Sequence, residues 1–134
     1  MVAPLCPYTK PRILRATLSE DDWVRVNEKA AETFKLNVEQ FVASENEFAV
    51  VLYVEGKKIV AGMPVAGDAQ EVSVNVQVGR IPVAVVHSHP NGSMETTDAD
   101  DRFGEEMASK YGEFRIYVIG YDEDNEVGMS YVDY

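Results

Sequence analysis

The chain has 134 residues, 46% of them hydrophobic and 26% charged, which predicts one globular domain with a single core rather than a disordered chain. Its formal net charge of −11 repels phosphate backbones, so we expect no nucleic acid partner. The charge either favours a basic or neutral protein surface as partner or serves only to keep the protein soluble. The single cysteine, Cys6, excludes an internal disulfide and a Cys-x-x-Cys zinc or redox motif.

The N-terminal region and the hydropathy of the chain set expectations for compartment and domain bounds. No apolar run reaches the roughly 18 residues of a membrane span, and the first residues lack the pattern of a secretory signal. We therefore expect a cytoplasmic protein with no membrane partner. Residues 1–11 are rich in proline and are expected to be poorly ordered, which leaves 12–134 as a single folded domain. Within it, 12–18 alternates weakly and is expected to form an edge strand.

The first helix is predicted to begin after Ser19, because a serine hydroxyl can cap a helix and three acidic residues follow in the first turn. Apolar residues then recur every three or four positions, the spacing of one buried helical face: Trp23, Val26, Ala30 and Phe34. Residues 35–46 show no clear periodicity and stay unassigned.

Two adjacent stretches predict a hairpin. Residues 48–54 form a nearly continuous apolar run, and residues 57–63 are predicted to return after a turn at Glu55-Gly56. Farther along, valines alternate with polar residues over 72–78, which predicts a half-buried strand.

Residues 81–86 are apolar on both faces, which is typical of a central strand that is covered on two sides. This strand is predicted to stop soon afterwards, because Pro90 removes a backbone donor and Asn91-Gly92 favours a turn.

A second helix is predicted after Thr96 or Thr97, either of which can cap it, and Gly112 is placed to end it. Its expected buried stripe is Ala99, Phe103, Met107 and Tyr111. Residues 114–121 predict another apolar strand, and 127–134 is expected to return after the acidic turn at 122–126. The elements together predict an α+β fold: a mixed, mainly antiparallel sheet with one helix before it and one within it.

Both histidines of the chain lie in the tripeptide His87-Ser88-His89 at the end of the predicted central strand. Side chains at positions i and i+2 of a strand share a face, so the two imidazoles can converge on one metal ion, while Ser88 points to the other face and is expected to be structural. Asp100, in the first turn of the next helix, is the expected third ligand. Gly104 lies one turn further, and we expect its missing side chain to let the helix approach the metal closely.

Each part of this pattern has a simpler explanation. Two histidines at a strand end can be polar rim residues, and Thr97-x-x-Asp100 can be a capping box in which Asp100 bonds only the backbone of the cap. The metal site is favoured because strand, histidine pair, turn, hydroxyl and acid follow in an order that brings the side chains together.

The segment from His87 to Asp100 resembles the signature of the JAMM (MPN+, JAB-domain) zinc metalloproteases. That signature is His-x-His-Pro, six residues, a hydroxyl residue, two residues and aspartate, and this chain has His87-Ser88-His89-Pro90, six residues, Thr97, two residues and Asp100. The family usually has serine at the position of Thr97, and threonine keeps the hydroxyl but adds a methyl group.

The family also has a glutamate in an upstream strand, followed by glycine and leucine. Glu47 and Leu52 match the glutamate and the leucine, whereas Val50 replaces the glycine. Glu45 stays open as an alternative to Glu47, because a strand would point both side chains the same way. Glu55 lies in the predicted turn and fits less well.

The resemblance implies an MPN/JAB-like (cytidine-deaminase-like) fold and one Zn²⁺ per chain, held by His87, His89 and Asp100 with an open position for water. Glu47 would move a proton from that water to the leaving amine, and the Thr97 hydroxyl would donate to the developing oxyanion. The implied enzyme is a compact, prokaryotic-type, deubiquitinase-like isopeptidase. Its protein substrate would be cut at the C-terminus of a ubiquitin-like protein, such as a sulfur carrier. The alternatives are a non-catalytic MPN-like interaction scaffold and a zinc-stabilised binding module.

Overall fold

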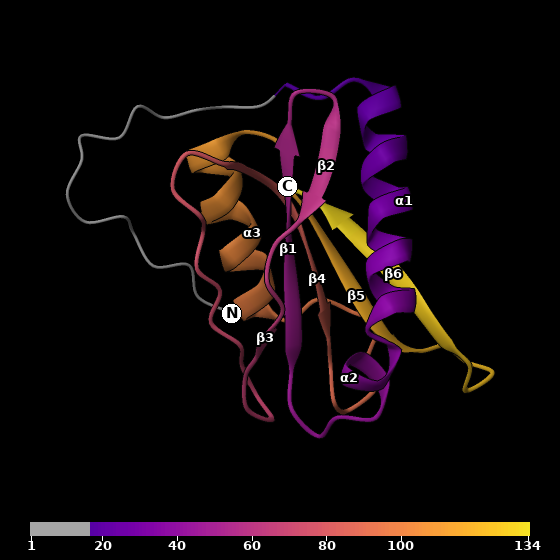
Figure 1. The fold of residues 1–134 in the computed structure, drawn as a ribbon. Coiled ribbons are helices and arrows are strands. Elements are labelled where there is room, and N and C mark those ends of the chain that lie inside the picture. Colours follow the sequence, from indigo (N-terminus) through magenta and orange to yellow (C-terminus); the bar gives the residue numbers. More distant parts are fainter. Residues whose placement is uncertain (1–16) are drawn as a thin grey trace.

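The computed structural model describes residues 17–134 (Figure 1). The proline-rich segment 1–11, Cys6 and most of the expected edge strand at 12–18 lie outside the described residues. The described end of that stretch, Thr17 and Leu18, forms no strand. Over the same described range, no helix is long and apolar enough to cross a membrane.

Within residues 17–134, six strands form one mixed sheet, in the order β2-β1-β4-β5-β6, with the short β3 also paired to β1. The strands are β1 (Phe48–Glu55), β2 (Lys58–Ala61), β3 (Val65–Ala66), β4 (Ile81–Ser88), β5 (Arg115–Tyr121) and β6 (Val127–Asp133). Every pairing is antiparallel except that of β4 with β5, which is parallel and is connected through α3 (Asp98–Tyr111). The predicted α+β class with a mainly antiparallel mixed sheet is therefore confirmed.

Helices cover both faces of the sheet, with α1 (Glu20–Leu36) on one side and α3 on the other (Figure 1). Ser19 caps α1 through a capping box with Asp22, and Val26 and Ala30 on its predicted inner face are fully buried. The unassigned stretch after α1 contains a second, short helix, α2 (Val38–Val42), which buries Phe41 against the same face of the sheet.

Alternate residues of the central strands supply two separate cores, because successive side chains of a strand point to opposite faces. Val51 and Val85 pack with Phe103 and Met107 of α3, whereas their neighbours belong to the core beneath α1 and α2. Strand β4 is buried along almost its whole length, which confirms the prediction of a central strand covered on two sides. Strand β4 extends to Ser88, so His87 lies near its end, between β1 and β5 in the centre of the sheet.

The half-buried strand predicted at 72–78 is wrong. This segment forms no ladder apart from one bridge residue at Ser73, although Val72 and Val74 are only 1% exposed and pack in the core beneath α3. The Tyr53 hydroxyl satisfies its backbone, accepting from the Gln77 N–H at 3.1 Å and donating to the Asn75 carbonyl at 3.4 Å. Alternating hydrophobicity therefore reports alternating burial of an extended segment, whether or not the segment pairs with a strand.

Candidate metal centre

The two histidines and Asp100 meet at the C-terminal end of β4. The Nε2 atoms of His87 and His89 lie 3.0 Å apart. The Oδ2 atom of Asp100, from the first turn of α3, lies 3.2 Å from His87 Nε2 and 3.0 Å from His89 Nε2. All three side chains are buried, with exposed fractions of 0%, 8% and 2% for His87, His89 and Asp100. The structure thus brings together the three metal ligands that the sequence predicts.

Backbone carbonyls determine the tautomers of both imidazoles. His87 Nδ1 lies 2.9 Å from the carbonyl oxygen of Tyr117, and His89 Nδ1 lies 3.1 Å from that of Ser93. A carbonyl oxygen can only accept, so each Nδ1 carries the proton and donates, which leaves a lone pair on each Nε2 of the neutral rings. The contact between the two Nε2 atoms therefore cannot be a hydrogen bond between neutral histidines.

Three acceptor atoms consequently face one another across 3.0 to 3.2 Å, inside the protein, with no proton between them in the neutral state of the rings. Such a cluster is repulsive unless a metal cation lies at its centre or one ring takes up a second proton on its Nε2. Ligands of a tetrahedral zinc at 2.0–2.1 Å are separated by ~3.3–3.4 Å, close to the separations seen here. Histidines that bind metal ordinarily donate their other N–H to a carbonyl or carboxylate, as both do in this protein.

The local charges also favour a cation. Burial raises the pKa of Asp100, but the hydrogen bonds that His87 and His89 donate to it when their rings are protonated, together with the Thr97 N–H, outweigh burial and hold that pKa far below its usual range. Burial lowers the pKa of His89, yet the hydrogen bond and charge of Asp100 and the charge of Glu47 outweigh this, and the pKa is raised overall. The carboxylate thus stays ionised beside rings that attract positive charge.

The simpler explanation for Asp100, a capping box, is also present in the structure. The Thr97 N–H donates to Asp100 Oδ2 at 3.0 Å, and the Asp100 N–H donates to Thr97 Oγ1 at 3.1 Å. The two roles do not compete, because the oxygen that accepts from the cap is the one that faces both imidazoles. The cap fixes the carboxylate in the orientation that the metal centre needs.

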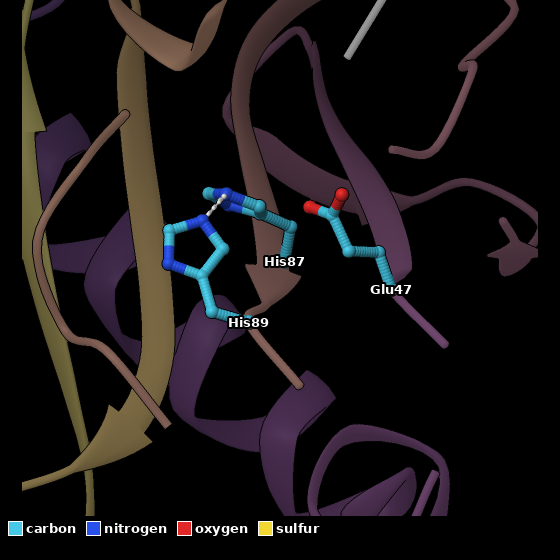
Figure 2. A group of neighbouring side chains, drawn as sticks. All are labelled: Glu47, His87 and His89. Atoms are coloured by element: carbon cyan, nitrogen blue, oxygen red, sulfur yellow. Dashed lines mark hydrogen bonds between the residues drawn. The ribbon is translucent and has the colours of Figure 1, made fainter. Parts of the chain in front are cut away.

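Glu47 lies directly before β1 and is 4% exposed. Ligand atoms of Glu47, His87 and His89 all lie within 4.8 Å of one another, so this buried group could hold a metal ion. Figure 2 shows the Glu47 carboxylate near the two imidazoles. Burial raises the pKa of Glu47, and the nearby histidines only partly offset this effect.

The alternatives to Glu47 lie elsewhere. Residues 44–46 form no strand, so the expected parity of Glu45 with Glu47 does not arise, and Glu45 is exposed. Glu55 forms an ion pair with Arg80, with its Oε1 2.9 Å from the Arg80 Nε. Of the three glutamates considered, the structure brings only Glu47 to the histidines.

A loop that carries no recognisable motif holds the backbone of Glu47. The Glu47 N–H donates to the Asp68 carbonyl at 2.7 Å, and the Gly67 N–H donates to the Glu47 carbonyl at 2.8 Å. A Cβ on Gly67 would lie 2.1 Å from the Glu71 carbonyl oxygen, so only glycine fits there. The sequence offered no signal for this contact beyond the glycine itself.

A cavity of about 220 Å³ opens beside the three ligands. It is lined by Glu47, Ala69, Gln70, His89, Pro90, Asn91, Thr97, Ala99 and Asp100. The Thr97 hydroxyl accepts from the Asp100 N–H, so its own proton is free to be donated to a group in the cavity. Sequence reasoning missed Gln70 and Asn91, because amide side chains in loops leave no spacing pattern.

The role expected for Gly104 is wrong. A Cβ there would lie 2.6 Å from the ring of Tyr134, so the absent side chain makes room for that ring rather than for a metal. The Tyr134 hydroxyl donates to Asp101, which ties the C-terminal end of the sheet to the first half of α3. Ser88 is structural as expected: it is buried, and its hydroxyl accepts from the Phe48 N–H at 3.2 Å.

Comparison of the chain with protein-family models and with curated protein sequences finds no match. The case for a metal centre therefore depends on the contacts, burial and tautomers described above.

Proposed function

We propose that the chain is a zinc-dependent metallopeptidase of the JAMM (MPN+) type, with an MPN/JAB-like fold. The observation that carries the proposal is the buried triangle of His87 Nε2, His89 Nε2 and Asp100 Oδ2, with separations of 3.0 to 3.2 Å and the protons held on the far side of both rings. Glu47 and an open cavity lie beside that triangle.

The donor set favours a transition-metal ion over calcium or magnesium, and the resemblance of the 87–100 segment to the family favours zinc among these ions. Two imidazole nitrogens and one carboxylate oxygen are typical of catalytic zinc sites, which keep the fourth position of a tetrahedron open. Calcium and magnesium prefer oxygen ligands and higher coordination numbers, which this triangle does not supply. When bound, the ion supplies Lewis acidity and makes water a stronger acid and a better nucleophile.

The residues around the cavity have complementary roles in peptide hydrolysis. His87, His89 and Asp100 would hold the ion, and the Tyr117 and Ser93 carbonyls orient the two rings. Glu47 accepts a proton from water in the cavity and delivers one to the leaving amine. The free proton of the Thr97 hydroxyl stabilises negative charge on the carbonyl oxygen of the scissile bond.

The proposed substrate is a peptide or isopeptide bond at the C-terminus of a ubiquitin-like protein, such as a sulfur carrier. The resemblance of the 87–100 segment to the family supports this substrate class. The net charge of −11 favours a basic substrate segment, because opposite charge speeds encounter and like charge opposes it.

The test has two stages. Purified wild-type protein is expected to contain one zinc per chain by elemental analysis, and His89→Ala is expected to contain almost none. Cleavage is then measured on a panel of ubiquitin-like proteins fused to a basic C-terminal extension. Glu47→Gln should keep its zinc and lose at least about 100-fold in rate, the low end of general base contributions. Glu45→Gln, an exposed neighbour, is the matched control and should cleave like wild type.

Absence of zinc from the wild-type protein, even after zinc is added back at neutral pH, would sink the metallopeptidase proposal and leave an MPN-like binding scaffold. Bound zinc with no cleavage of any fusion would favour the zinc-stabilised binding module. Full activity in Glu47→Gln would show that the general base has been misassigned.

A further inference from the structure

The loop between β4 and α3 supplies the carbonyl that orients His89, and this loop lies against β5. The His89 N–H donates to the Ile119 carbonyl at 3.3 Å, and the Tyr121 N–H donates to the Gly92 carbonyl at 2.7 Å. Within the loop, the Gly92 N–H donates back to the His89 carbonyl at 2.8 Å. These bonds bracket Gly120, so the loop and β5 are in close backbone contact at that residue.

No side chain fits between β5 and the loop at Gly120. A Cβ there would lie 2.5 Å from the Gly92 carbonyl oxygen and 2.6 Å from the Ser93 carbonyl oxygen. Both neighbours are backbone atoms, which cannot rotate away as the end of a side chain can. The Ser93 oxygen is the atom that accepts the Nδ1 proton of His89. The absence of a side chain at Gly120 therefore determines where that acceptor can lie.

The other side of the loop is fixed by β6. The Ser130 hydroxyl donates to the Met94 carbonyl at 2.7 Å, directly after Ser93. Gly128 is the register partner of Gly120 across the β5–β6 pair. A Cβ on Gly128 would meet only the flexible end of the Met94 side chain, at 3.2 Å. The two paired glycines thus differ in whether a methyl group would push on the backbone of the loop.

We propose that Gly120 is a positioning residue for the metal centre, acting through the Ser93 carbonyl on His89. Because Gly120 has no side chain, the Ser93 carbonyl can lie where it accepts the Nδ1 proton of His89. This contact orients the Nε2 atom of His89 toward the ion. The proposal depends on the metal centre of the proposed function and adds the β5–β6 hairpin to the parts that build it.

The size of the expected displacement follows from the contacts. Ordinary contact begins at 3.4 Å, so the Ser93 oxygen would have to move from 2.6 Å to 3.4 Å from a new Cβ, a shift of about 0.8 Å. A shift of this size, directed away from the ring, stretches the 3.1 Å contact to His89 Nδ1 beyond the ~3.6 Å at which a hydrogen bond is lost. The Nδ1 proton then has no fixed acceptor, and the Nε2 lone pair is no longer aimed at the ion.

The test compares wild type, Gly120→Ala and Gly128→Ala. Zinc dissociation constants are measured by competition between the metal-free protein and a chromogenic chelator. Long-range ¹H–¹⁵N spectra of the imidazoles report the tautomer of each ring, and they are easily assigned because the chain has only two histidines. Circular dichroism establishes that each variant is folded.

Gly120→Ala is expected to bind zinc about 10- to 100-fold more weakly, the usual effect of losing the partner of a ligand histidine, and to lose the pure Nδ1–H signature of His89. Gly128→Ala should match wild type in both measurements. If Gly120→Ala does not fold, Ser130→Ala becomes the test. This variant should also bind zinc more weakly than wild type, but by less than about tenfold.

The outcomes separate the two proposals. If wild type binds zinc, and Gly120→Ala binds it with equal affinity and shows unchanged His89 spectra, the positioning role is overturned and the metal centre remains. Equal loss in Gly120→Ala and Gly128→Ala also overturns it, because a general defect of the hairpin would then be the cause. Failure of wild type itself to bind zinc overturns the metal centre and the positioning role with it.

Discussion

Replacing Asp100 with asparagine separates its two structural roles. One oxygen, Oδ2, accepts from the Thr97 N–H in the helix cap and also faces both Nε2 atoms. Asparagine has almost the same shape and keeps an oxygen that can cap the helix, but it carries no charge. We expect the metal-free variant to differ from wild type by less than about 1 kcal/mol, because the cap survives and one charged acceptor leaves the triangle.

The effect of zinc should be very different in the two proteins. Zinc at 100 times its dissociation constant stabilises a folded protein by about 2.7 kcal/mol. For 134 residues, an unfolding entropy of about 2.1 cal/mol/K per residue converts this to a rise in Tm of about 10 °C. If Asp100→Asn weakens zinc binding about 100-fold, the same zinc concentration stabilises it by only ~0.4 kcal/mol, or about 1–2 °C.

Differential scanning fluorimetry with and without zinc measures these shifts directly, and Thr97→Val serves as the control. Valine removes the hydroxyl that caps α3 but keeps the backbone N–H that bonds Asp100, so Tm should fall by the equivalent of about 0.5–2 kcal/mol whether or not zinc is present. The zinc-induced rise should remain near that of wild type. A full zinc-induced rise in Asp100→Asn would refute the reasoning and reduce Asp100 to a capping residue.

Three further predictions concern stability. Burial raises the pKa of Tyr117 from 10.0 to about 12, so folding favours the neutral phenol. The free energy of unfolding should therefore be highest below pH 10 and fall by up to about 3 kcal/mol between pH 10 and pH 12. Urea midpoints of Tyr117→Phe should decline less over that range, and identical profiles would count against the assignment. Gly104→Ala should lower the free energy of unfolding by about 1–3 kcal/mol despite the helix propensity of alanine, because its Cβ meets the Tyr134 ring. A raised Tm would contradict this contact. Gly67→Ala should destabilise by at least as much, since its Cβ meets the Glu71 backbone, and a neutral effect in urea unfolding would show that the loop can move.

The parts of the site that could be predicted depend only on the spacing of residues within a single helix or strand. The i, i+2 spacing of His87 and His89 on a strand and the place of Asp100 in a capped first turn both follow from the geometry of single elements. The helices and most strands follow for the same reason, since apolar spacing reports which face of each element is buried.

The parts that escaped prediction are tertiary contacts of the backbone. The Tyr117 and Ser93 carbonyls that set the histidine tautomers can come from any residue type, so no motif marks them. The close contact at Gly120 and the ring over Gly104 depend on which elements become neighbours. The prediction of a strand at 72–78 is wrong for a related reason. Burial of an extended segment beneath α3 and pairing in a sheet both produce an alternation of apolar and polar residues.

The single parallel pair of the sheet has a kinetic consequence for the metal centre. His87 belongs to β4 and His89 directly follows it, Asp100 belongs to the helix that crosses over to β5, and the Ser93 carbonyl belongs to a loop held in place by β5 and β6. In the unfolded chain the two neighbouring imidazoles are not held together with Asp100, and this third ligand joins them only when the crossover has docked. Zinc should therefore slow unfolding strongly and change the folding rate little, because it binds after the folding transition state. The zinc-bound protein is then long-lived because its barrier to unfolding is raised, while the barrier to folding is unchanged.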